Sequence, residues 1–376
     1  MTSYSFSRAD TSVLSRWWWT VDHLLLAAVL SLVAVGALLV MAASPAVASR
    51  IGLADSYFLT RHLALIVPSL GLMLATSLLT PVGVRRAALA ALAISLVLLV
   101  ATLAIGVEIK GARRWIYLGG FSLQASEFAK PAFAVACAWL FAERVRDDRI
   151  PGRLLATVLF AMVLGLIILQ PDLGQAVVLT AVWVAQFFLA GLSLWLVGFL
   201  VVAGAGGMVA AYLFLPHVTS RIDRFLDPSS GDNYQIAKSL EAFLHGGLFG
   251  RGPGEGAVKN QLPDAHADFV FAVLGEEFGS LAAIFVVSLF AVVVLRGFAR
   301  AFAERDLFVL LAVAGLLVQF GVQALINMGS ALHLLPTKGM TLPFVSYGGS
   351  SLLAMGFAIG MVLALTRRRV GDGGHA

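Results

Sequence analysis

The residues best suited to acid–base chemistry in this sequence are four carboxylates and a histidine within fourteen positions. Asp264, His266 and Asp268 are separated by single residues, and Glu276 and Glu277 follow shortly afterwards. A carboxylate at the boundary between water and an apolar segment could act as a general base on a substrate held in the membrane. In the alternative, structural interpretation, Asp268 caps the first turn of a helix.

The same segment offers oxygen and nitrogen ligands for a divalent cation, Mg²⁺ or Mn²⁺. Asp264, His266 and Asp268 lie at i, i+2 and i+4 with no helix before them, which is a weak metal signature. The sequence therefore leaves a cation requirement open.

Two short segments contain cations that could neutralise an anionic ligand. One holds Arg113 and Arg114, followed by Trp115, and the other holds Lys338. Arginine presents a planar fork that matches phosphate oxygens, and tryptophan is a common interfacial anchor. The alternative is that these cations contact lipid headgroups or pair with carboxylates such as Glu108.

The elements that must position these side chains are membrane helices. Of the 376 residues, 60% are hydrophobic and 12% are charged, whereas soluble domains have ~45–50% and ~25%. Runs of roughly 17–25 apolar residues are long enough to cross a bilayer as helices, and no alternating barrel pattern appears. We therefore predict an all-α integral membrane fold with about ten transmembrane helices, near 22–43, 61–79, 85–106, 127–142, 154–170, 172–191, 193–215, 268–295, 307–329 and 345–366.

Basic residues in short loops predict which side of the membrane each loop faces. With the N-terminus inside, fourteen arginines fall in inner segments and seven Lys or Arg residues in short outer segments. Both termini are therefore expected in the cytoplasm, with tails at 1–21 and 367–376 on a single polytopic domain that spans 1–376. The net charge of +5 then reflects topology and anionic lipid, and no nucleic-acid partner is expected.

One long polar segment, 216–267, connects the seventh and eighth predicted helices and is expected to form a large extracytoplasmic loop. Apolar residues at helical spacing predict an amphipathic helix over 234–244. Six glycines follow within 246–256 and indicate a tightly turning segment. Their spacing does not match a nucleotide-binding loop, which needs Gly-Lys-Ser/Thr before a helix.

Other charged residues occur where lipid would make them costly. Glu276 and Glu277 fall inside the eighth predicted helix, Glu276 about 12 Å deeper than Asp268 and Glu277 on roughly the opposite face. We expect one glutamate to support the Asp268 face and the other to bond a neighbouring helix. Glu127 and Lys130 are expected to form an i, i+3 ion pair that hides two charges.

Two further polar residues have structural interpretations. Asp172 follows Pro171 between two predicted helices, and both residue types favour the start of a helix. Asn327, near the end of the ninth predicted helix, is expected to hydrogen-bond between helices.

Seven segments, in this order, make the chain similar to the SEDS family of membrane proteins (shape, elongation, division and sporulation). The resemblance spans nearly the whole chain. It is closer to division members than to elongation members. Three features favour the division members: Arg113-Arg114-Trp115, Lys338 and the tryptophans at 17–19. One departure is Ala125, where many members have proline. The segments are Gly111-Ala112-Arg113-Arg114-Trp115, Gln124 to Lys130, Gln170-Pro171-Asp172-Leu173-Gly174, Gly246 to Gly252, Leu262 to Phe269, Gly275-Glu276-Glu277 and Ser346 to Ser351.

The resemblance implies a ten-helix peptidoglycan glycosyltransferase that polymerises glycan strands from lipid II at the division septum of the inner membrane. It also implies a class B penicillin-binding transpeptidase as partner and regulation by other divisome proteins. The family aspartate that polymerisation requires matches Asp268. A lipid II flippase, an elongation-type polymerase and a noncatalytic scaffold are the alternatives.

The residues suggest how such a transfer would proceed. Asp268 would take the proton of the acceptor hydroxyl, while cationic side chains, alone or with a divalent ion, would receive the pyrophosphate charge. The expected substrate contacts are Arg113, Arg114, Lys259, Lys338 and His266. The expected supporting residues are Glu127, Lys130, Glu276, Glu277 and Asp172. Both lipids would enter sideways through an apolar groove beneath the long loop.

Overall fold

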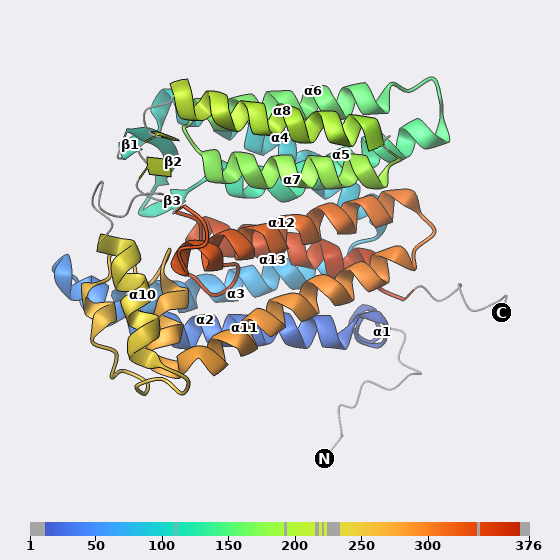
Figure 1. Cartoon of the computed structure of the whole chain (residues 1–376). Coiled ribbons are helices and arrows are strands. Elements are labelled where there is room, and N and C mark those ends of the chain that lie inside the picture. The colour runs from blue at the N-terminus through green and yellow to red at the C-terminus, as the bar shows by residue number, and fades with distance from the viewer. Residues whose placement is uncertain are drawn as a thin grey trace, which may run out of the picture.

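A computed structural model describes residues 12–109, 111–191, 194–214, 218–219, 222–223, 234–336 and 339–368. Long helices lie side by side in one bundle, and a small sheet and helix α10 sit together at one end (Figure 1). Within the described residues, ten long helices coincide with the ten predicted segments, which confirms the helical membrane fold. They are α2 His23–Arg50, α3 Tyr57–Ser77, α4 Pro81–Ile105, α5 Ala125–Arg146, α6 Gly152–Leu169, α7 Leu173–Leu189, α8 Leu194–Phe214, α11 Val270–Phe302, α12 Leu307–Ala331 and α13 Gly349–Leu365.

Six of these helices, α2, α3, α4, α6, α11 and α12, are long and apolar enough to cross a bilayer. Helices α7 and α13 are apolar but have only 17 residues each. The protein is therefore a multi-pass membrane protein, and ten crossings remain a prediction.

The centre of the bundle is formed by α5, α12 and α13, whose side chains are mostly buried. Small residues let neighbouring backbones approach closely here, as is common between membrane helices. A Cβ added at Gly356 of α13 would lie 2.5 Å from Ser69 O of α3, and one at Gly360 would lie 1.8 Å from Thr76 Oγ1. This pair of glycines sets the distance between α13 and α3.

A three-stranded antiparallel sheet follows α4, in a segment that the sequence did not predict to be ordered. Its strands are β1 Val107–Ile109, β2 Ala112–Leu118 and β3 Phe121–Leu123. Gly111 (φ +78°) precedes β2, and Gly119 and Gly120 (φ +54° and +86°) form the turn into β3. Trp115 and Tyr117, two positions apart on β2, share one face of the sheet.

The long loop contains the predicted amphipathic helix, α10 Tyr234–Gly246, and the short 3₁₀ helix η1 Val258–Gln261. The glycine-rich turn between them packs against a break in α11 at Gly279 (φ +81°, ψ 177°). Two intrahelical hydrogen bonds of α11 are lost at this break and four bonds to the turn replace them. Arg251 N and Gly252 N donate to Glu276 O and Glu277 O, while Ser280 N and Leu281 N donate to Gly247 O and Leu248 O.

The first and last described segments meet at the end of the bundle opposite α10. Arg368 N donates to Thr20 O at 3.1 Å, just after helix α1 Val13–Thr20. Asp22 accepts from Arg296 (2.9 Å) and Arg300 (2.7 Å) of α11 at the same end. The two chain ends therefore share one side of the bundle.

Candidate active site

Asp268 lies in the last turn of the long loop, before α11 begins. The helix starts at Val270, and its N-cap residue, Phe269, makes no side-chain cap. The capping interpretation of Asp268 is therefore wrong. The turn is closed by Asp264 O, which accepts from the N–H groups of Ala267 (2.9 Å) and Asp268 (3.1 Å).

Hydrogen bonds from two other segments hold this turn in place. Ser346 Oγ donates to Ala267 O (2.5 Å), and Tyr347 N donates to His266 O (2.9 Å). Asn327 Nδ2, from α12, donates to Asp268 O (3.0 Å) and to Met340 O (2.6 Å), so it bonds two loop segments rather than a neighbouring helix. The backbone of Asp268 is thus fixed by elements far away in the sequence.

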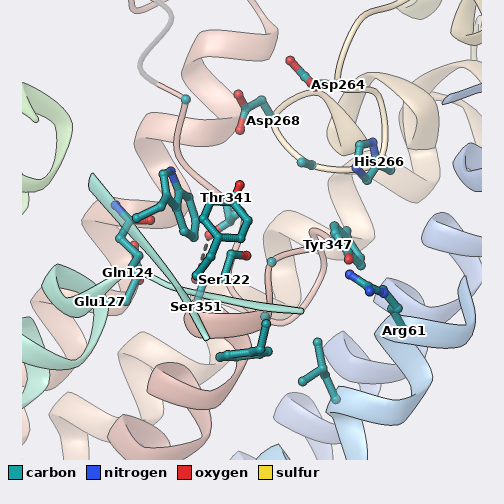
Figure 2. A pocket seen from close by; sticks show the side chains of 18 of the residues that line it. Arg61, Ser122, Gln124, Glu127, Asp264, His266, Asp268, Thr341, Tyr347 and Ser351 are labelled. Carbon is teal, nitrogen blue, oxygen red and sulfur yellow. Dashed lines mark hydrogen bonds between the residues drawn. The ribbon is translucent and has the colours of Figure 1, made fainter. Parts of the chain in front are cut away.

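The Asp268 carboxylate faces a cavity of about 760 Å³, within the size range of ligand pockets. Figure 2 shows Asp264, His266 and Asp268 on one side of it and Gln124, Glu127 and Ser122 on the other. The sheet supplies an aromatic wall of Trp115, Tyr117 and Phe121. A cavity therefore lies at the end of the long loop, but polar as well as apolar residues line it, and sideways entry of lipids stays a prediction.

The floor of the cavity is polar although it lies within the bundle. Glu127 lines the floor and pairs with Lys130 at 3.1 Å, and both side chains are almost fully buried, so the predicted ion pair is confirmed. Gln175 of α7 donates to the other oxygen of Glu127. Gln323 of α12 accepts from Lys130 Nζ at 2.8 Å and donates to Thr341 O at 3.1 Å.

Among the residues that the structure describes, Arg61 of α3 is the only arginine or lysine that lines the cavity. It is exposed, and its guanidinium lies 4.7 Å from the centre of the Tyr57 ring. Figure 2 shows Arg61 beside Tyr347. In the sequence, Arg61 was only one of the seven cations in the short outer segments. Cations on that side oppose the usual distribution of charge across a membrane, and this was the available signal.

Three of the cations expected to contact substrate lie elsewhere. Arg113 makes an exposed pair with Glu108 at 3.4 Å. Arg114 donates to Gln170 O (3.2 Å) and to Pro171 O in the turn between α6 and α7. These contacts make Arg114 a brace for that turn, and neither arginine lines the cavity.

Lys259 is the third of these cations, and it is buried in an ion pair with Glu277. Glu276 accepts from Val258 N (2.7 Å), Lys259 N (2.8 Å) and His245 Nδ1 (3.1 Å). Both glutamates therefore tie the long loop to α11, and neither lines the Asp268 cavity. That one of them supports the Asp268 face stays a prediction.

Lys338 lies outside the described residues. The next residue, Gly339 (φ +61°), lines the cavity, and a Cβ added there would be 3.5 Å from Asp268 Oδ2. Asp172 caps α7, accepting from Gln175 N at 3.4 Å, as the helix-start interpretation expected. It also accepts from Gln124 Nε2 at 3.2 Å.

His266 lines the cavity as an uncharged ring. Burial lowers its pKa to about 4, Asp264 works in the opposite direction, and Arg50 adds a small lowering. The ring packs against Phe58 (centroids 4.1 Å apart) and Tyr347 (5.2 Å). At neutral pH it can therefore offer shape and one hydrogen-bonding nitrogen, but no positive charge.

The sequence left a divalent cation open, and the side chains of the cavity show whether they suit one. Within the described ranges, no group of three or more His, Cys, Asp or Glu side chains is arranged to hold a metal ion. Asp264, His266 and Asp268 thus line one cavity without forming a ligand cluster. These residues do not fit a resident cation, and no step below depends on one.

Sequence analysis did not single out Thr341, Tyr347 and Ser351 as site residues, although all three line the cavity. They come from the segment before α13 and from its first turn. Thr341 Oγ1 donates to Ser351 Oγ at 2.7 Å, which closes this side of the wall. Ser346 to Ser351 was noted only for its resemblance to the family, because serine and glycine residues do not by themselves indicate a site.

Comparisons with known proteins agree with this geometry. A family model for FtsW, RodA and SpoVE, described as "Cell cycle protein", matches residues 22–370. The chain is 45% identical over 371 residues to a probable peptidoglycan glycosyltransferase FtsW of Caulobacter vibrioides. The match covers 98% of this chain and 95% of that protein. The FtsW of Coxiella burnetii with the same description is 39% identical and covers 92% and 96%.

Two solved structures have the same fold. One belongs to a study of how a peptidoglycan synthase complex coordinates polymerization and crosslinking, with a TM-score of 0.77, 30% identity and coverage of 93% of this chain and 98% of that one. The other is the rod shape determining protein RodA of Thermus thermophilus, with a TM-score of 0.67, 29% identity and coverage of 93% and 97%.

Proposed function

Because the chain belongs to the family of FtsW, RodA and SpoVE, we propose that it is a division-type peptidoglycan glycosyltransferase whose active site is the Asp268 cavity. Its substrate is lipid II, which serves as both donor and acceptor. The observation that carries this proposal is one carboxylate, in a turn that two other segments hold through its backbone, at the edge of a cavity of about 760 Å³.

The reaction forms one glycosidic bond and breaks one bond to phosphate. The 4-hydroxyl of the acceptor GlcNAc attacks the anomeric carbon of the donor sugar, and undecaprenyl pyrophosphate leaves with inversion. Asp268 accepts the hydroxyl proton during the attack. The aromatic wall of Trp115, Tyr117 and Phe121 holds the sugars apart from bulk water.

The pyrophosphate needs positive charge as the bond breaks. Arg61 supplies a guanidinium in the cavity wall, and Lys338 remains the second proposed contact. Arg113, Arg114 and Lys259 have no part in this scheme, since other groups occupy them. His266 completes the wall as a neutral contact.

The partner and the location are also proposed. One similar solved structure is described as a complex that polymerizes and crosslinks, which supports a class B penicillin-binding transpeptidase as partner. The division type of the curated relatives supports other divisome proteins as further partners and the septal inner membrane as the location.

The test is polymerisation of labelled lipid II by the purified protein with its partner transpeptidase. Asp268→Asn should lower the rate by at least ~100-fold, the usual share of a general base. Asp264→Asn removes the same charge from the same cavity, and asparagine tolerates the φ of +52° found there. Equal losses in both variants would show that charge, rather than proton transfer by Asp268, matters.

A further inference from the structure

A second cavity, of about 460 Å³, lies between α2, the segment 253–260 and the outer part of α11. It shares no lining residue with the Asp268 cavity. Its α2 wall is apolar and includes Leu38, Met41 and Pro45. Leu38 and Met41 are 51% and 50% exposed on a helix able to cross a bilayer, so this wall faces lipid chains.

The opposite end of this cavity is polar and contains the buried Lys259–Glu277 pair. Lys259 Nζ donates to Ala42 O (3.0 Å), Gly254 O (3.5 Å) and the Glu277 carboxylate. An ammonium group has three N–H donors, so these contacts use all of them. Lys259 therefore has no donor left for a phosphate.

Glu277 retains capacity for a ligand. Its side chain lines the cavity and is only 1% exposed, and within the described part of the chain its Oε2 has no hydrogen-bond partner. A buried carboxylate oxygen without a donor is costly, so this position favours a hydrogen-bond donor.

The local charge indicates what kind of donor fits. Glu276 adjoins Glu277 and bonds the backbone N–H groups of Val258 and Lys259 and the His245 ring, so among the described residues Lys259, paired with Glu277, is the one lysine or arginine that pairs with either carboxylate. A ligand with a positive head would balance this excess and would satisfy Glu277. Its chains would lie on the apolar α2 wall.

We infer that this cavity binds a phospholipid of the adjoining leaflet whose headgroup carries a primary ammonium, such as phosphatidylethanolamine. The ammonium donates to Glu277, the exposed Asn260 at the rim contacts the phosphate, and the acyl chains cover Leu38 and Met41. Lys259 belongs to η1, which leads directly into the turn that holds Asp268. Occupancy of this site therefore steadies the segment before the proposed active site.

The binding experiment varies the lipid rather than the protein. Native mass spectrometry of the full chain in detergent would compare phosphatidylethanolamine with its N-methyl, N,N-dimethyl and trimethyl (choline) forms, which keep the charge but lose N–H donors. Retention of one lipid should weaken along the series, by about tenfold or more in total, the value of a hydrogen bond to a charged group. Equal retention across the series, or tighter retention of phosphatidylglycerol, would overturn the inference.

Protein variants then locate the site. Met41→Trp fills the cavity and should remove the preference for the primary ammonium, whereas Leu30→Trp, at a residue 41% exposed on the same helix but outside the cavity, should keep it. If Met41→Trp does not fold, Leu38→Phe provides the same test. A preference that survives a cavity-filling variant would place the lipid elsewhere. If free phosphoethanolamine displaced the lipid at equal concentration, the acyl chains would add nothing to binding, which would contradict their proposed role.

Discussion

At the scale of single residues, the position of the positive charge is the main finding. Arg61 reaches the cavity from α3, and its guanidinium lies over the Tyr57 ring and beside Tyr347. A guanidinium held in this way loses little conformational freedom when it binds an anion. Arg61 is therefore better prepared to bind pyrophosphate than the exposed Arg113.

Replacing Arg61 by glutamine should weaken use of the donor lipid. Loss of a charge-assisted hydrogen bond costs about 1.5–3 kcal/mol, so kcat/KM for lipid II should fall roughly 10- to 150-fold. The matched control is Arg113→Gln, whose arginine has only the exposed pair with Glu108 and should stay within about twofold. Similar losses in both variants would contradict the assignment of Arg61.

His266 predicts a dependence of stability on acid. Its pKa in the folded protein is about 4, below the ordinary value of 6.5, so between these values the unfolded chain binds a proton that the folded chain does not. The free energy of unfolding should therefore fall as pH is lowered from 6.5 to about 4, by on the order of 3 kcal/mol. Thermal unfolding in detergent across this range would measure it.

The variant His266→Phe keeps the aromatic contacts with Phe58 and Tyr347 and removes the titration. Its melting temperature should change less between pH 6.5 and 4 than that of the wild type. His23→Gln, at an exposed position, should retain the wild-type slope. An unchanged slope in His266→Phe would assign the acid sensitivity to other groups.

The sequence could single out Asp268 but could not show which groups most of the cations contact, for a physical reason. A carboxylate just before an apolar run is visible locally, whereas the use of a cation depends on its partner. Arg114 bonds carbonyls 56 and 57 residues away, and Lys259 pairs with a glutamate 18 residues away. Such pairings are set by tertiary packing, which hydropathy and spacing do not report.

At the scale of elements, the glycine-rich turn and the break in α11 form one unit. The four backbone bonds between them require the turn to lie directly against the helix. A Cβ added at Gly250 (φ +83°) would lie 2.2 Å from Glu277 O, and one at Gly246 would lie 2.0 Å from Gly275 O. The glycines of this segment therefore allow the turn to pack closely against α11.

Substituting Gly250 tests this packing. Gly250→Ala should destabilise the protein by about 2–4 kcal/mol, from strain at positive φ and a backbone clash. Gly254 has a similar φ of +87° but open space around it, so Gly254→Ala should show the strain alone, about 1 kcal/mol. Denaturation in detergent would compare the two. Equal effects would mean that the turn does not press on α11.

The same scale shows what hydropathy can predict. The ten helices appear within a few residues of the predicted segments because apolar length is a local property. The sheet after α4 could not be predicted in this way. Its strands are three to seven residues long, with arginines and glycines among them, and they are stabilised by pairing and by Ser350, which donates to Ser122 O and accepts from Gln124 N, each at 3.0 Å.

At the scale of the whole molecule, chemistry is concentrated at one end of the bundle. The sheet, α10 and the Asp268 turn lie together there, opposite the end where Arg368 meets Thr20. The predicted orientation places this end outside the cytoplasm. That arrangement suits polymerisation on one face of the membrane, and it does not require passage of a headgroup through the bundle.

Cysteine labelling in intact cells would test the orientation. The natural Cys137 is fully buried and should give little background. A membrane-impermeant maleimide should label a cysteine introduced by Glu255→Cys in the long loop and should not label Asp148→Cys, at a side chain 94% exposed on the opposite end, until the membrane is permeabilised. The reverse pattern would invert the predicted topology.

The break at Gly279 also bears on how the protein responds to its bilayer. The part of α11 after the break, 280–302, is about 34 Å long and matches an average hydrocarbon thickness of about 30 Å with slight tilt. Because the glycine turn is bonded to both sides of the break, the helix cannot tilt there without moving the loop. We therefore expect hydrophobic mismatch in a thinner or thicker membrane to act on the loop that leads through η1 to Asp268.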